Sequence, residues 1–180
     1  MKTVKLGEYI QTITPKTKIQ AKKFLSNGKY PVVSQEAGVI NGWWQNEADV
    51  MELDKPVIVF GDHTRNVKYV DFDFVAGADG TKILRPPDDI DSRYLYYFLI
   101  ANPVESLGYA RHYRILKEML MPVPSLAEQH RIVERLDGIF AQIDRASVLL
   151  EENIANTNAL KQSLLAQAFD ADSATHTHTD

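Results

Sequence analysis

The chain has 180 residues, of which 44% are hydrophobic and 9% aromatic, and its formal net charge at pH 7 is −4. This composition is typical of a globular protein and excludes a disordered chain, while the negative charge disfavours a generic nucleic-acid binder. The absence of cysteine excludes disulfide bonds, cysteine nucleophiles and cysteine-based metal sites, and it agrees with a cytoplasmic location. No apolar run follows the N-terminal residues, so we expect neither a signal peptide nor a membrane span.

The first 124 residues predict an α+β domain with many short strands, and no internal repeat is visible. An ordered element begins at residues 6–10, and a helix is capped by Asp91 or Ser92 and ended by the Asn-Pro pair at 102–103. Alternating or continuous apolar runs predict strands at residues 29–34, 57–60, 68–74, 81–84 and 118–123.

A long helix is predicted to follow this domain. Two prolines end the preceding strand, and Ser125 and Glu128 have the S-x-x-E spacing of a capping box. Residues 126–169 contain no proline, so the helix would be about 66 Å long at about 1.5 Å per residue, too long to be stable without a partner surface. We therefore expect a domain at 1–124, a dimerisation and spacer helix at 125–170, and a polar, disordered tail at 171–180.

Apolar residues recur along the predicted helix at alternating steps of four and three residues, which is the spacing of a coiled-coil seam. Asn153 and Thr157 occupy the same stripe and would fix its register at some cost in stability. The alternative is a helix packed on its own domain, but 124 residues are too few to cover it. The predicted dimerisation residues are Ile132, Leu136, Ile139, Ile143, Leu150, Leu160 and Leu164.

Charge is unevenly distributed along the chain. Residues 125–180 carry four basic and nine acidic side chains, so the long helix is a poor candidate to lie along DNA phosphates. The remaining 16 basic and 15 acidic side chains belong to the first domain. Five lysines cluster near its start, where they either contact phosphates or form a solvated face: Lys16, Lys18, Lys22, Lys23 and Lys29.

Three polar segments of the first domain suit contact with DNA. Segment 42–46 places two tryptophans beside two amides, which suits stacking and adenine recognition, although at least one tryptophan is expected in the core. Segment 61–65 contains Asp62, which can accept from a cytosine amine, and Arg65, which can bind guanine in a bidentate manner. Segment 108–114 interleaves basic and aromatic residues, or is alternatively a solvated connector with inward tyrosines.

An enzymatic role is not expected from these residues. An Asp-His pair such as Asp62 and His63 could bind a metal or perform acid–base chemistry, yet no second ligand lies at a recognisable spacing. The sequence also lacks a nucleophile-elbow serine and a glycine-rich phosphate loop.

Taken in order, the motifs resemble the specificity subunits of type I restriction-modification systems. The most specific is segment 121–129, Met-Pro-Val-Pro-Ser-Leu-Ala-Glu-Gln, with Ile132 and Val133 behind it, which is similar to the entry into the family's long conserved helix. The others are Leu6-Gly7-Glu8, Lys29-Tyr30-Pro31-Val32-Val33-Ser34-Gln35, Phe60-Gly61-Asp62-His63-Thr64-Arg65 and Tyr94-Leu95-Tyr96-Tyr97.

The resemblance implies a noncatalytic, sequence-specific DNA reader. Its partners would be double-stranded DNA, modification subunits that bind S-adenosylmethionine and, in the endonuclease, restriction subunits; this chain would carry no cofactor or metal of its own. From the chemistry of the polar segments we predict these DNA-binding residues: Gln35, Trp43, Trp44, Gln45, Asn46, Asp62, His63, Thr64, Arg65, Lys68, Arg111, His112 and Arg114.

This chain departs from the usual family pattern of two recognition domains and two antiparallel helices, because it has one of each. We therefore expect a half-subunit that forms an antiparallel homodimer and reads a split palindrome. The competing hypothesis is a coiled-coil interaction module that binds protein and shows no salt-dependent DNA binding.

Overall fold

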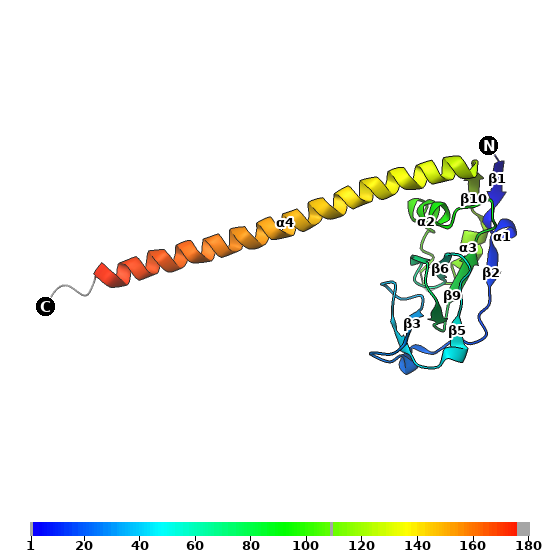
Figure 1. The fold of residues 1–180 in the computed structure, drawn as a ribbon, viewed down its shortest axis with the longest axis horizontal. Coiled ribbons are helices and arrows are strands. Elements are labelled where there is room, and N and C mark those ends of the chain that lie inside the picture. The colour runs from blue at the N-terminus through cyan, green and yellow to red at the C-terminus, as the bar shows by residue number, and fades with distance from the viewer. Residues whose placement is uncertain (1, 109, 176–180) are drawn as a thin grey trace. The chain divides into compact units, whose positions relative to one another are not determined.

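A computed structural model describes residues 2–108 and 110–175 of the chain, with side chains described up to residue 169. Two compact units are present, Met1–Val133 and Glu134–Asp180. The first unit contains the described strands and the first turns of the long helix α4 (Leu126–Thr175), and the rest of α4 belongs to the second unit (Figure 1).

Two four-stranded sheets form the centre of the first unit. The first sheet has the order β2-β9-β6-β7 and is antiparallel throughout. Its strands are β2 (Gln11–Ile13), β6 (Val57–Gly61), β7 (Val67–Val70) and β9 (Thr81–Arg85). The second sheet has the order β4-β3-β8-β5, and its β3–β8 pair is parallel. Its strands are β3 (Tyr30–Val33), β4 (Gly42–Trp44), β5 (Val50–Met51) and β8 (Phe74–Ala76). The 3-10 turn η1 (Ala21–Lys23) precedes β3, and the 3-10 turn η2 (Glu47–Asp49) lies between β4 and β5.

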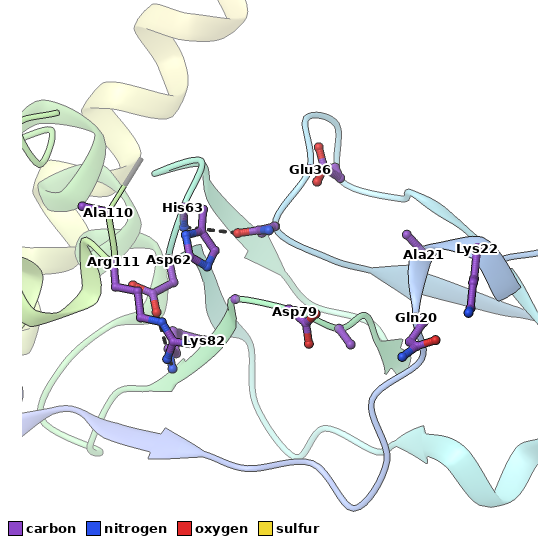
Figure 2. A pocket seen from close by; sticks show the side chains of 13 residues that line it. Gln20, Ala21, Lys22, Glu36, Asp62, His63, Asp79, Lys82, Ala110 and Arg111 are labelled. Atoms are coloured by element: carbon purple, nitrogen blue, oxygen red, sulfur yellow. Dashed lines mark hydrogen bonds and ion pairs between the residues drawn. The ribbon is translucent and has the colours of Figure 1, made fainter. Parts of the chain in front are cut away.

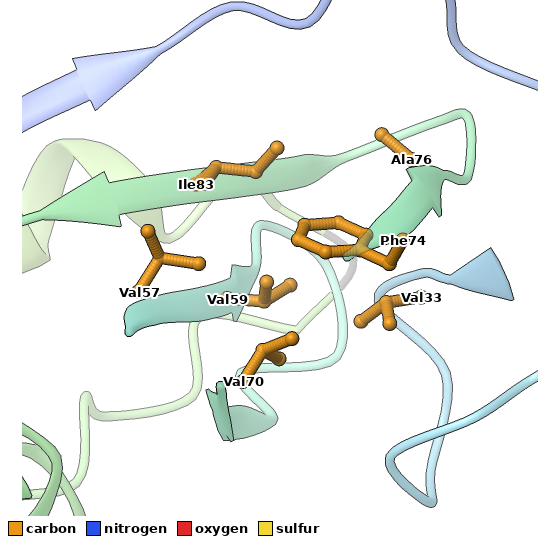
Figure 3. Close-up of a cluster of buried hydrophobic side chains, with 7 residues drawn as sticks. All are labelled: Val33, Val57, Val59, Val70, Phe74, Ala76 and Ile83. Carbon is orange, nitrogen blue, oxygen red and sulfur yellow. The ribbon is translucent and has the colours of Figure 1, made fainter. Parts of the chain in front are cut away.

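The main hydrophobic core joins these two sheets. Val33, Phe74 and Ala76 of the second sheet pack against residues of the first, and all of them are buried (Figure 3). Because successive side chains of a strand face opposite ways, the neighbouring Val32 and Val75 instead join a second cluster. The first-sheet members of the main core are Val57, Val59, Val70 and Ile83.

A two-stranded sheet and three short helices complete the first unit. Strand β1 (Lys2–Lys5) pairs antiparallel with β10 (Leu120–Val123), and α1 (Leu6–Tyr9) packs beside α3 (Tyr113–Glu118). Helix α2 (Ser92–Ala101) packs on β6 and β7. The Asp91 side chain caps α2 by accepting from two backbone N–H groups, as the sequence predicted.

The prediction of one strand over residues 68–74 is wrong. Strand β7 ends at Val70, and Phe74 begins β8 in the other sheet. Val70 and Phe74 both face the core that joins the sheets. The apolar alternation therefore continues where the chain passes from one sheet to the other, and it does not reveal the end of the first strand. The expected strand at 118–123 is shorter, because Glu118 ends α3.

Helix α4 begins where the sequence predicted. The Ser125 hydroxyl accepts from the Glu128 N–H at 3.3 Å, which is one half of the predicted capping box, while the Glu128 carboxylate pairs with Arg131 at 3.2 Å. The helix continues to Thr175, so the first five residues of the expected tail are helical. Residues 176–180 of that tail lie outside the described part of the chain.

Candidate nucleic-acid interface

A cleft with a volume of about 1030 Å³ lies in the first unit. It brings together residues from five separate segments, and Figure 2 shows their side chains around it. Four predicted DNA-binding residues line it: Gln35, Asp62, His63 and Arg111. Lys22 of the N-terminal lysine cluster and Ala110 of segment 108–114 also line it, whereas sequence reasoning missed the other lining residues, which are Gln20, Ala21, Glu36, Ala78, Asp79, Gly80 and Lys82.

Asp62 is a structural residue of the cleft. Its side chain is 3% exposed, and Oδ1 accepts from the Tyr113 N–H at 2.8 Å. Its backbone carbonyl accepts from the His112 N–H at 2.8 Å, and its own N–H donates to the Gly80 carbonyl at 2.8 Å. The Asp62 carboxylate therefore joins the 61–65 loop to the start of α3 through Oδ1, and base reading by this residue stays a prediction.

His112 is also structural, because its side chain is fully buried. Nε2 accepts from the Leu107 N–H at 3.1 Å, so the proton lies on Nδ1, which donates to the Asp62 carbonyl at 3.0 Å. No ring nitrogen remains for DNA, and the prediction of a direct contact is corrected. Its neighbours Arg111 and Arg114 are exposed, so His112 fixes the segment that presents them; Tyr109 lies outside the described residues.

Lys68 is likewise buried and bonded within the protein. Its side chain is 5% exposed, and Nζ donates to the Ser34 carbonyl at 2.7 Å and to Asn41 Oδ1 at 2.8 Å. Burial lowers the pKa of the Lys68 ammonium to about 8, and the negative charge of Glu36 opposes this shift. A phosphate contact is excluded by this burial, and Lys68 instead secures both ends of the loop between β3 and β4.

The floor of the cleft is formed by close backbone approach between two loops. Gln35 Oε1 accepts from the His63 N–H at 3.2 Å, and the Gln35 carbonyl accepts from the Thr64 hydroxyl and from Asn66 Nδ2. Gly80 has a φ of +73°, and a Cβ there would lie 2.5 Å from Gln35 Oε1. The positive φ favours glycine at position 80, and a side chain there would also displace the Gln35 amide. The structure thus brings together Gln35, His63 and Thr64, three of the candidate DNA-binding residues.

Arg65 is placed outside the cleft. The residue has a positive φ of 63°, and its guanidinium NH1 donates to the Val104 carbonyl at 3.2 Å. It lines a smaller pocket with residues of α2 and the segment after it. The Arg65 side chain is exposed to solvent, so its contact with guanine stays a prediction.

The 42–46 segment has mostly structural contacts. Trp44 Nε1 donates to Asp49 Oδ2 at 2.8 Å, and its ring packs on the second hydrophobic cluster. Asn46 caps η2 by accepting from the Ala48 N–H at 3.2 Å. Trp43 is half-buried and pairs through its backbone with Leu25, while Gln45 is exposed. A core tryptophan was expected; Trp44 packs against the second cluster but is itself only partly buried.

The charges lining the cleft are mixed. Three cations, Lys22, Lys82 and Arg111, face three carboxylates, Glu36, Asp62 and Asp79 (Figure 2). Lys82 Nζ lies 3.7 Å from Asp62 Oδ2. Of the five N-terminal lysines, Lys22 lines the cleft, and Lys18 donates to the Thr81 carbonyl at 2.9 Å. Such a lining offers donors and acceptors side by side, which suits base edges better than a row of phosphates.

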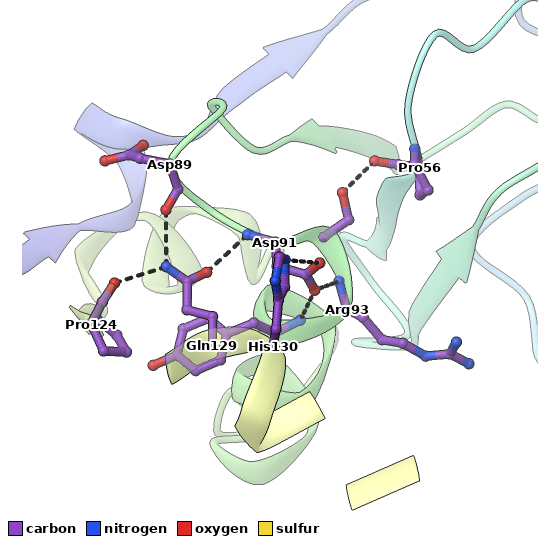
Figure 4. Close-up of polar contacts among 9 residues, drawn as sticks. Pro56, Asp89, Asp91, Arg93, Pro124, Gln129 and His130 are labelled. Carbon is purple, nitrogen blue, oxygen red and sulfur yellow. Dashed lines mark hydrogen bonds and ion pairs between the residues drawn. The ribbon is translucent and has the colours of Figure 1, made fainter. Parts of the chain in front are cut away.

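Gln129 joins α4 to the rest of the first unit, a role that the sequence did not reveal. Its side chain is fully buried; Oε1 accepts from the Asp91 N–H at 2.8 Å, and Nε2 donates to the Asp89 and Pro124 carbonyls, each at 2.9 Å (Figure 4). His130 pairs with Asp91 at 3.6 Å. All hydrogen-bonding groups of the Gln129 amide except one lone pair are thereby used.

The predicted seam of α4 is largely uncovered in the single chain. Ile132 and Leu136 are half-buried, and the remaining predicted seam residues are exposed: Ile139, Ile143, Leu150, Leu160 and Leu164. Within the described part of the chain no helix is long and apolar enough to span a membrane, and no group of three or more potential metal ligands is found.

Comparison with known proteins agrees with this architecture. Residues 1–156 match the family model described as the type I restriction modification DNA specificity domain. The chain is 30% identical over 176 residues to the EcoR124I/EcoR124II specificity subunit of Escherichia coli, covering 89% of this chain and 43% of that protein. It therefore spans less than half the length of this curated relative.

Two solved structures share the fold. One comes from a study of complex assembly and conformational transition of the type I R-M system. It matches with a TM-score of 0.73 and 22% sequence identity, and the match covers 93% of this chain and 45% of that chain. The other is the HsdS subunit from Thermoanaerobacter tengcongensis, with a TM-score of 0.58 at 22% identity over 79% of this chain and 38% of that chain. Because the family model covers most of the sequence, the chain belongs to the family of type I restriction modification DNA specificity domains.

Proposed function

We propose that this chain is a noncatalytic, sequence-specific DNA-recognition subunit of a type I restriction-modification methyltransferase and endonuclease. The observation that carries the proposal is the mixed-charge cleft within the part of the chain that matches the DNA specificity family. Its relatives are named specificity subunits of type I restriction enzymes, which agrees with this role.

The cleft offers chemistry for reading bases. Arg111 and Lys82 can donate to guanine acceptors, and the Glu36 carboxylate can accept from the amine of cytosine. The buried Asp62 and His112 hold the segment that carries Arg111, and Gln35 bonds the segment that carries Glu36 to the 61–65 loop, so both segments are positioned before DNA binds. A preorganised site loses less conformational entropy on binding.

The second part of the proposal is an antiparallel homodimer formed through α4. The exposed apolar seam supports it, since a contiguous apolar stripe is unfavourable in water. The seam from Ile139 to Leu164 spans about 38 Å at about 1.5 Å per residue, which is comparable to one turn of DNA. A two-fold dimer would read a two-fold target, so the site would be a split palindrome with an unread spacer.

The partners in this proposal are double-stranded DNA, modification subunits and restriction subunits. S-adenosylmethionine would bind to the modification subunits, and this chain would act in the cytoplasm. Its own residues would contribute recognition and spacing, and no step of methyl transfer or cleavage.

The test is to co-produce the full chain with modification subunits and to sequence the methylated DNA. We expect a bipartite palindromic motif and a DNA affinity that falls steeply as salt rises. An asymmetric motif would contradict the homodimer while leaving DNA recognition intact. No DNA binding at any salt concentration, alone or assembled, would favour the competing protein-interaction module.

A further inference from the structure

The loop between β3 and β4, residues 36–41, presents two adjacent apolar side chains to solvent. Val39 is 44% exposed and Ile40 is 45% exposed. The other large apolar residues of the first unit that are exposed to this degree, within its described residues, are isolated in the sequence. Within the described residues of the first unit, this loop is therefore the place where two such side chains adjoin each other in sequence.

The 36–41 loop is held rigidly at its base. Asn41 Oδ1 accepts from the Ser34 N–H at 2.8 Å, the Ser34 hydroxyl at 2.9 Å and Lys68 Nζ at 2.8 Å. Asn41 Nδ2 donates across the loop to the Ala37 carbonyl at 2.7 Å. Gly38 has a φ of +77°, which favours glycine at the bend. Such a network fixes the loop without any contact from Val39 or Ile40 being required.

The loop also begins at the cleft. Glu36, the first residue of the loop, and Gln35 before it both line the cleft, and Figure 2 shows Glu36 on this loop. The cleft supplies polar groups, and the adjoining loop supplies rigid apolar ones, since Val and Ile are both β-branched and have restricted χ1 angles. The apolar feature of base edges in the major groove is the C5-methyl group of thymine.

We propose that Val39 and Ile40 contact thymine methyl groups and so determine part of the sequence specificity of this chain. The inference rests on the proposed DNA-recognition function and extends it to a loop outside the predicted reading residues. Lys68 and Asn41 act as positioning residues for this loop. Neither apolar side chain can bind a phosphate, so their contribution is to specificity and not to salt-dependent attraction.

The test uses the full chain, assembled with modification subunits, and two random-sequence duplex libraries that differ only in thymine or deoxyuridine. Bound duplexes are selected and sequenced. Uracil pairs as thymine does but lacks the C5-methyl group. We therefore expect at least one thymine position whose enrichment is lower in the deoxyuridine library, by about fourfold per contacted methyl group. A fourfold change corresponds to about 0.8 kcal/mol.

Two variants locate the effect. The double variant Val39→Ser and Ile40→Ser carries no methyl group at either position, so it should lose the difference between the libraries at that position and keep the preferences elsewhere. Leu120→Ser is the matched control, because it removes an exposed apolar side chain from β10, and it should behave as the unchanged protein does. Thermal unfolding of each variant verifies that it folds.

The outcomes separate the two proposals. If the unchanged complex enriches no sequence, the DNA-recognition function fails and this inference fails with it. If it enriches a motif equally from both libraries, or if the double variant keeps the uracil effect, the loop inference is overturned while DNA recognition stands.

Discussion

At the residue scale, burial separates the side chains that hold the cleft from those available to a ligand. Asp62, Lys68 and His112 carry the chemistry expected of DNA-binding residues, yet each is buried and hydrogen-bonded within the protein. A sequence states the chemistry of a side chain but not its exposure. Arg111 remains exposed at the cleft, in the segment that His112 fixes.

Arg111 is therefore the best single test of base reading. Replacing it with alanine should cost about 1–3 kcal/mol of binding free energy for the preferred site and relax one position of the methylated motif. The measurement is titration of the assembled complex with matched duplexes, together with sequencing of methylated DNA. The control Arg93→Ala removes the same charge from α2, outside the cleft, and should leave the motif unchanged. An unchanged motif in both variants would exclude Arg111 as a reader.

Lys68 predicts a pH dependence of stability. Burial lowers its pKa in the folded chain from 10.5 to about 8, so between these values the unfolded chain holds more protons than the folded one. The free energy of unfolding should therefore rise with pH across this interval, and this group should contribute no slope below about pH 8.

Urea unfolding of the unchanged protein and of Lys68→Met, measured over this pH range, isolates the contribution. We expect the difference between their unfolding free energies to change above pH 8 in favour of the unchanged protein. Parallel pH profiles would show that the lysine has an ordinary pKa.

At the element scale, helix α4 is specified by local signals at its start and by long-range contacts through Gln129. The prolines and the Ser125 cap were visible in the sequence, and the structure places the helix start there. The strand at 68–74 shows the opposite case. Its alternation was correctly recognised, but the change of sheet after Val70 depends on which neighbours the two halves pair with.

Gln129→Ala tests the attachment of α4. The variant leaves the Asp91 N–H and the Asp89 and Pro124 carbonyls without their partner, and one unsatisfied buried group costs about 1–3 kcal/mol. We expect chemical denaturation of the first unit to show a loss of at least this size. Gln142→Ala makes the same change at an exposed position of α4 and should alter stability by less than about 0.5 kcal/mol. Equal losses in the two variants would contradict a specific role for Gln129.

At the scale of the whole molecule, the exposed seam of α4 makes assembly the central question. Leu150 is 62% exposed in the single chain, although it occupies a position that coiled coils bury. A charged side chain at position 150 should destabilise the protein only if a second helix covers that position. The prediction therefore concerns the assembly and not the isolated fold.

Leu150→Glu should convert the proposed homodimer into a monomer, as measured by light scattering during gel filtration at several concentrations, and should abolish methylation of a palindromic site. Ala155→Glu adds the same charge away from the predicted seam and should leave the dimer intact. A dimer that persists in Leu150→Glu would show that another surface pairs the chains.

The sequence by itself determined the α+β class, the start and great length of α4, and its apolar seam, because caps, prolines and periodicity act over a few residues. It also placed Gln35, His63 and Arg111 among the candidate reading residues, and the structure brings all three to one cleft. Only the tertiary structure decided which polar residues are buried, where β7 gives way to β8, and that Lys22, Glu36 and Lys82 complete the lining. These outcomes depend on contacts between segments far apart in the chain, and no local pattern encodes which segments meet.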